Sequence, residues 1–223
     1  KIGLLSLILL LVFPTSYYFG SVYTESLFLF LAASSVFSVR KHNFILGGVL
    51  AGLASATRVL GLMLFPLLII ELFRAGKAER FKALVGVILA PLGTIFYMLY
   101  LKAVTGDFLY FLTAQPGFGA ERSAKPFILL PQVVYRYFKI FLALPVASMK
   151  FFNAGLEFVF ALVPLLLLVF FWKKMRPSYW ILTLGVLILP TLTGTFSSMP
   201  RYALMGFLLI PFIVQKLGKY FIP

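Results

Sequence analysis

Long apolar runs separated by short polar clusters make up most of the chain. A run needs about 20 residues to cross a bilayer as a helix, with a usual range of roughly 17–25. Backbone N–H and C=O groups inside lipid must bond to one another, so such runs favour helices. The pattern predicts eight helical segments, near residues 2–13, 25–39, 44–57, 59–73, 81–101, 153–172, 179–195 and 202–217.

Three stretches depart from a simple crossing pattern. The runs at 44–57 and 59–73 are short for a crossing, and we expect them to form a helical hairpin inside the bundle. Segment 127–149 is apolar but contains Arg136 and Lys139, and a cation at the bilayer centre costs about 2.5–3.5 kcal/mol. We therefore expect 127–149 to form an amphipathic helix in the outer membrane interface, with a kinked buried span as the alternative.

The composition is typical of an integral membrane protein. Of 223 residues, 62% are hydrophobic and 12% are charged, and the mean hydropathy is +1.04. A soluble domain carries roughly 45–50% apolar and about 25% charged residues. The predicted fold is an all-α, polytopic transmembrane helix bundle of about eight membrane segments plus the interfacial helix, with residues 1–223 as a single integral-membrane domain. We expect a multi-pass protein of the plasma membrane in a prokaryote, or of the endoplasmic reticulum in a eukaryote.

Two residue counts exclude several kinds of site. The chain has no cysteine, which excludes disulfides, thiol catalysis and cysteine-based zinc or iron–sulfur centres. His42 is the only histidine, and we interpret it as a solvated loop residue.

The small residues between Gly47 and Ala56 predict close helix packing within the molecule, with a dimerisation face as the alternative.

The net charge of +14 comes from 20 Lys and Arg against 6 Asp and Glu. In a soluble protein this excess would indicate a nucleic-acid partner. Here most cations lie in short loops between apolar runs, where they set topology by the positive-inside rule, so we expect no nucleic-acid partner. The predicted cytoplasmic loops are 40–41, 74–82, 173–176 and 216–219. The predicted outer loops are 14–24, 103–152 and 196–201, together with the turn at Arg58.

The first outer loop, FPTSYYFGSVYTES at 13–26, contains the most informative polar residues. Its aromatic side chains, Tyr23 among them, could line a pocket at the membrane interface, and Glu25 opens the next apolar run. In the alternative interpretation Thr24 caps that helix, Glu25 favours its positive end, and the tyrosines form an interfacial belt.

Two further motifs face the same predicted side. Asp107 lies in Thr105-Gly106-Asp107-Phe108, although Gly and Asp are also typical of turns. Arg201 lies in SSMPRY at 197–202, where a snorkelling anchor is the alternative. Arg58 and Arg122 reach this side too. Guanidinium groups make paired hydrogen bonds to phosphate, so the pattern suggests a lipid-phosphate substrate.

Four stretches resemble, in order, the membrane mannosyltransferases that add the second mannose of GPI anchors, a family with prokaryotic relatives in the GT-C superfamily. They are FPTSYYFGSVYTESLFLFL, LAGLASATRVLGLMLFPLLIIE, TGDFLYFLTAQ and SSMPRYALMGFLLIPF. The resemblance implies a GT-C-like fold and an inverting glycosyltransferase. Such an enzyme moves a hexose, expected to be mannose, from a polyprenyl-phosphate carrier to a lipid-linked or glycan acceptor on the non-cytoplasmic face, among membrane lipids.

The resemblance also suggests roles for individual residues. Catalytic roles fall on Glu25 and Asp107, and a divalent cation is the candidate cofactor, with no ligand set assigned. The candidate substrate-binding residues are Tyr23, Arg58, Gln115, Arg201 and Tyr202. The principal acid of the family lies in a long outer loop after the first transmembrane helix. We expect this chain to lack that helix and loop, and to be inactive by itself.

Two other classes of function fit the same residues. A lipid or small-molecule transporter or flippase would also use an aromatic, arginine-rich outer face to bind a headgroup. Transporters often show inverted repeats, and no repeat is apparent in this sequence. A non-catalytic subunit of a membrane transferase complex is the third hypothesis.

Overall fold

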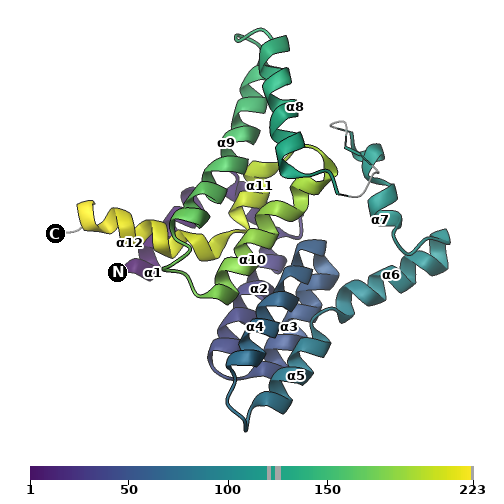
Figure 1. Ribbon diagram of the computed structural model, residues 1–223, viewed down its shortest axis with the longest axis vertical. Coiled ribbons are helices and arrows are strands. Elements are labelled where there is room, and N and C mark those ends of the chain that lie inside the picture. The colour runs from purple at the N-terminus through teal and green to yellow at the C-terminus, as the bar shows by residue number, and fades with distance from the viewer. Residues whose placement is uncertain (120–121, 124–126, 222–223) are drawn as a thin grey trace. The chain divides into compact units, whose positions relative to one another are not determined.

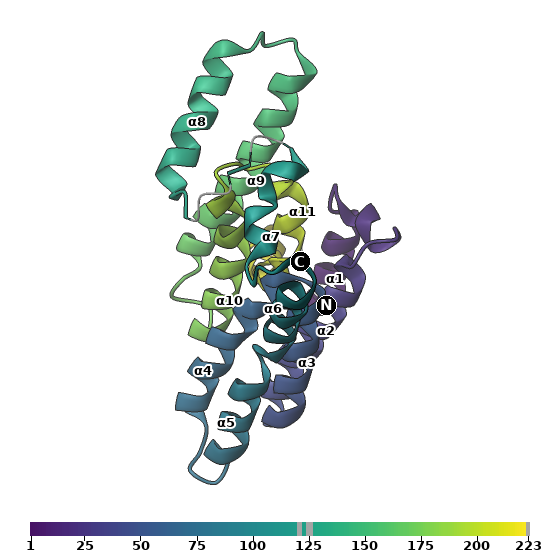
Figure 2. The ribbon, with the colours of Figure 1, turned by 90° about the vertical axis from the view of Figure 1, so that its right-hand side faces the viewer.

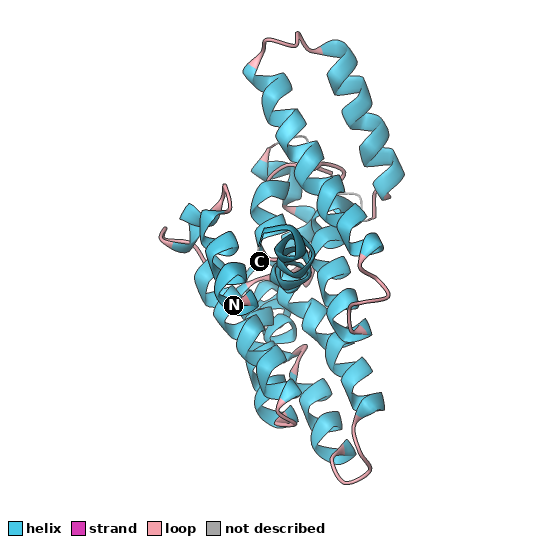
Figure 3. Ribbon diagram, turned by 90° about the vertical axis from the view of Figure 1, so that its left-hand side faces the viewer, coloured by secondary structure: helices cyan, strands magenta, loops and turns pink. Residues whose placement is uncertain are grey.

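The computed structural model describes residues 1–119, 122–123 and 127–221. These residues form helices and loops with no strand among them, which confirms the all-α prediction (Figure 3). The contacts divide the chain into two compact units. The first contains residues 1–16, 111–175 and 186–223, and the second contains 17–110 and 176–185. The single domain over 1–223 stays a prediction.

The second unit is a bundle of apolar helices built around α3. Its helices are α2 (Glu25–Arg40), α3 (Phe44–Thr57), α4 (Leu64–Arg74), α5 (Arg80–Leu89), α6 (Leu92–Thr105) and the start of α10 (Pro177–Ile188). Figures 1 and 2 show α2, α3, α4 and α5 alongside one another. A Cβ on Gly48 of α3 would overlap the backbone of Gly86 in α5, so only glycine allows this approach. The predicted close packing of small residues within the molecule is confirmed.

The first unit packs its helices in three pairs. Its α-helices are α1 (Ile2–Val12), α7 (Tyr110–Thr113, from residue 111), α8 (Leu130–Ala143), α9 (Met149–Phe170), α11 (Met199–Leu204) and α12 (Ile210–Phe221). The pairs are α1 with α12, α9 with α11, and α8 with α9. Figure 2 shows α8 and α9 joined by a short loop. Helix α8 buries Val133 and Tyr137 and exposes Tyr135, Phe138 and Leu142, and the amphipathic interfacial helix at 127–149 stays a prediction.

Among the residues that the structure describes, two helical stretches are long and apolar enough to cross a membrane, Arg80–Thr105 and Met149–Phe170. The first contains α5 and α6, which are separated at Ala90 and Pro91. The other apolar helices are shorter, so the prediction of about eight membrane segments stays a prediction.

Other predicted segments are also interrupted. The run at 59–73 begins as a short 3-10 helix, η2 (Val59–Met63), and becomes α-helical only from Leu64. The run at 202–217 contains the end of α11, the 3-10 helix η5 (Phe207–Leu209) and α12. Pro211 lacks an N–H and fits best in the first turn of a helix, where it lies as the second residue of α12.

Candidate functional site

Glu25 and Arg58 form a buried ion pair in the second unit. Glu25 is the first residue of α2, and Arg58 follows the last residue of α3. The Nη1 group of Arg58 donates to Oε1 of Glu25. The Glu25 side chain is 0% exposed and the Arg58 side chain is 13% exposed. The two motifs, 33 residues apart in the sequence, therefore place opposite charges together in a site that is largely shielded from solvent.

The position of Arg58 depends on a sharp change in chain direction after α3. The Arg58 backbone is extended, with φ −152° and ψ 140°, and its N–H donates to the Ala54 carbonyl at 3.1 Å. Three residues later the N–H of Gly61 donates to the Arg58 carbonyl at 2.8 Å. A Cβ on Gly61 would overlap the Ala54 backbone, so this return against α3 requires glycine. Gly61 was not among the predicted site residues, because a single glycine in an apolar run gives no specific indication of a turn.

Thr24 is the N-cap residue of α2, the position that the alternative interpretation gives it. The Thr24 side chain makes no capping hydrogen bond to α2. Its Oγ1 instead accepts from Nη1 of Arg58 at 3.4 Å. The Thr24 backbone, with φ −87° and ψ 4°, lies outside the extended region typical of a side-chain cap, which accounts for the missing bond.

The tyrosines of the first outer loop form a small aromatic group near the start of α2. The rings of Tyr17 and Tyr18 stack at 4.4 Å, and Tyr18 meets Tyr23 edge-on at 5.3 Å. Tyr17 and Tyr23 are more than half exposed. Exposed amphipathic rings suit both a membrane interface and a substrate pocket, so both interpretations of these tyrosines stay open.

Asp107 lies in the turn that ends α6. Gly106 adopts the left-handed conformation with φ 80°, and Oδ1 of Asp107 accepts from the Leu109 N–H at 2.8 Å. This is the turn geometry of the alternative interpretation. The catalytic role of Asp107 stays a prediction.

The other predicted site residues belong to the first unit. Gln115 donates through Nε2 to the Phe111 carbonyl at 2.8 Å and accepts from Arg122 at 3.4 Å. Arg201 and Tyr202 lie in α11. The predicted residues thus divide between the units, and the structure brings Glu25 and Arg58 into direct contact.

A polar cluster that was not among the predicted sites holds the residues that precede α11 in the chain. The hydroxyl of Tyr137 donates to Oε2 of Glu157 at 2.5 Å and accepts from the Phe196 N–H at 3.1 Å. It also lies 3.3 Å from Oγ1 of Thr195. Burial and the hydrogen bond to Glu157 raise the pKa of Tyr137 above its ordinary value, so the hydroxyl keeps its proton. These contacts hold the segment that leads into the Pro-Arg-Tyr element.

Replacing Tyr137 by phenylalanine should destabilise the protein by about 1–3 kcal/mol, because the buried Phe196 N–H and the Glu157 carboxylate lose a partner. Denaturant unfolding in a neutral detergent measures the loss. Tyr135→Phe is the matched control, since Tyr135 lies on the same helix and is exposed. Equal stability of the two variants would show that the cluster contributes nothing.

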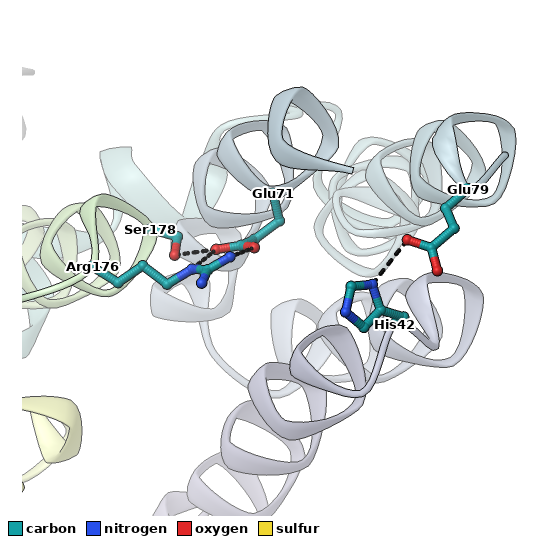
Figure 4. A network of polar contacts seen from close by, with 5 residues as sticks. All are labelled: His42, Glu71, Glu79, Arg176 and Ser178. Carbon is teal, nitrogen blue, oxygen red and sulfur yellow. Dashed lines mark hydrogen bonds and ion pairs between the residues drawn. The ribbon is translucent and has the colours of Figure 1, made fainter. Parts of the chain in front are cut away.

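A second network that the sequence analysis missed joins α4 to the start of α10. Both oxygens of Glu71 accept from Arg176, at 2.7 Å from Nε and 2.6 Å from Nη2, and the Ser178 hydroxyl also donates to Glu71 (Figure 4). The figure also shows the contact between Nδ1 of His42 and Oε2 of Glu79, at 2.8 Å. His42 is well exposed, as predicted for a loop residue.

The divalent cation stays a prediction. Within residues 1–119, 122–123 and 127–221, no three His, Cys, Asp or Glu side chains come together as metal ligands. Glu25 contacts the cationic Arg58, which would repel a metal ion. We assign no chemical step to a cation.

No family model, curated protein or solved structure matches the chain. The resemblance to GPI mannosyltransferases therefore rests on the four sequence stretches alone.

Proposed function

We propose that this chain belongs to a membrane glycosyltransferase that moves a hexose, expected to be mannose, from a polyprenyl-phosphate carrier to a lipid-linked or glycan acceptor. The supporting observation is the buried ion pair between Glu25 and Arg58. The two residues come from separate motifs of the family resemblance. A chance likeness would not require these motifs to meet in the fold.

The geometry suggests how the pair would act on the donor. Arg58 donates through Nη1 to Glu25 and Thr24. A planar guanidinium suits a phosphate because it can make paired hydrogen bonds. A cation held where charge develops on the departing phosphate stabilises the transition state. Glu25 has no exposed surface and accepts from Arg58, so we assign it the role of positioning Arg58.

The proposed setting is a multi-pass membrane protein with about eight membrane segments and an interfacial helix at 127–149. The two long apolar stretches, Arg80–Thr105 and Met149–Phe170, support insertion in a membrane. The exposed tyrosines 17 and 23 suit the outer interface, where a lipid carrier presents its phosphate. The membrane would be the plasma membrane of a prokaryote or the endoplasmic reticulum of a eukaryote.

The test is a transfer assay with the protein in the form that its gene encodes, reconstituted in liposomes. The probe is a polyprenyl-phosphate donor carrying labelled mannose, with a glycolipid acceptor. We expect label to become covalently attached to the acceptor. Movement of the intact donor across the bilayer without transfer would identify a flippase and overturn the proposal, and so would the absence of both activities.

A further inference from the structure

A small cavity lies at one end of the second unit, at the opposite end of α2 from Glu25. Its volume is about 200 Å³. The residues that line it are Val39, Arg40, His42, Phe44, Glu71, Arg74, Ala75 and Arg176. Ligand pockets for drug-sized molecules measure roughly 300–1,000 Å³, so this cavity suits a smaller group.

The lining of the cavity is cationic. Three arginines against one glutamate give a formal charge of +2 when His42 is neutral. The negative charge of Glu71 mainly compensates Arg176, because both Glu71 oxygens accept from that side chain. The Ser178 hydroxyl also donates to Glu71, so this carboxylate is held by α10 and its preceding residue.

Arg40 and Arg74 supply the uncompensated charge. Within the described part of the chain, neither side chain makes a hydrogen bond or an ion pair, and both are exposed. Each ends a helix, α2 or α4, where a cation gains about 0.3–1 kcal/mol from the helix dipole. That gain explains an arginine at a helix end. It does not explain why two such ends, with Arg176 from a distant segment, surround one cavity.

The three arginines also come from three of the predicted cytoplasmic loops, 40–41, 74–82 and 173–176. All three arginines line one cavity of the second unit, which agrees with placing these loops on the same side of the membrane. Basic pockets between helices on the cytoplasmic side are suited to anionic lipid headgroups. Guanidinium groups recognise phosphate by paired hydrogen bonds, which a small cationic cavity can arrange around one phosphate.

We propose that this cavity binds a phosphate group, through Arg40 and Arg74 with Arg176 held in place by Glu71. The phosphate belongs either to an anionic phospholipid headgroup of the cytoplasmic leaflet or to a free phosphate ion. The site is separate from the Glu25–Arg58 pair and does not depend on the proposed transferase activity.

Equilibrium dialysis of the purified full chain in a neutral detergent tests the proposal. The probes are radiolabelled inorganic phosphate and short-chain phosphatidic acid, with phosphatidylcholine as the neutral-headgroup reference. We expect saturable binding that weakens with added salt. The double variant Arg40→Gln/Arg74→Gln should bind about 30-fold more weakly, the factor expected when two cationic contacts to an anionic headgroup are lost. Binding of phosphatidic acid alone identifies the lipid headgroup, and binding of both probes identifies free phosphate as sufficient.

The matched control is Arg80→Gln/Lys82→Gln, which removes two charges from a predicted cytoplasmic loop without touching the cavity lining. This variant should bind like the unmodified chain. If the first double variant fails to fold, Arg40→Lys/Arg74→Lys keeps the charge and should show a smaller loss, because lysine cannot make paired bonds. Three results would overturn the proposal: no binding of either probe, equal binding of phosphatidylcholine, or an equal loss in the control.

Discussion

Replacing both members of the buried pair, as Glu25→Gln/Arg58→Gln, should lower hexose transfer by the complete protein at least about 100-fold. The double variant leaves neither charge buried alone, so it avoids the large destabilisation that follows when one partner of a buried pair is removed. It also removes the guanidinium that would face the donor phosphate. The measurement is the initial rate of transfer from a polyprenyl-phosphate-mannose donor, with the unfolding midpoint recorded in the same detergent.

Two further variants separate function from structure at this site. Arg58→Lys keeps a positive charge beside Glu25 but loses the planar guanidinium, so this variant should retain only part of the activity of the unmodified protein. His42→Gln/Glu79→Gln removes an exposed polar contact elsewhere in the second unit and should transfer normally. If the Glu25→Gln/Arg58→Gln protein turns over like the unmodified one, the pair serves folding alone, and the proposed role of Arg58 fails.

Replacing Arg176 by glutamine should destabilise the protein by about 3–5 kcal/mol, because it leaves the Glu71 carboxylate buried without its cationic partner. Only 6% of the Glu71 side chain is exposed, and Arg176 supplies two of its hydrogen bonds. Denaturant unfolding at neutral pH measures the change. Glu79→Gln is the control, since it breaks an exposed contact worth about 0–1 kcal/mol. An Arg176→Gln protein as stable as Glu79→Gln would contradict the assignment of Glu71 and Arg176 as a stabilising pair.

Local sequence patterns determined the helical content and many of the helix bounds. The apolar run at 44–57 coincides with α3, because backbone bonding within one helix needs only neighbouring residues. The glycines of that run indicated close helix packing, since a missing side chain has the same steric meaning in any fold. The pattern missed the break between α11 and α12, where Gly206 and Pro211 interrupt an otherwise apolar run.

Only the tertiary structure decided which polar side chains meet. Glu71 and Arg176 are 105 residues apart, and Tyr137 and Thr195 are 58 apart, so no local period links the members of either pair. The loop charges predicted that Arg58 and Glu25 lie on the same side of the membrane. The contact between the two side chains depends on the turn at Gly61 after α3. The sequence specifies which charges must be compensated when they leave water. Their partners depend on how the helices pack, and that packing is a property of the folded chain as a whole.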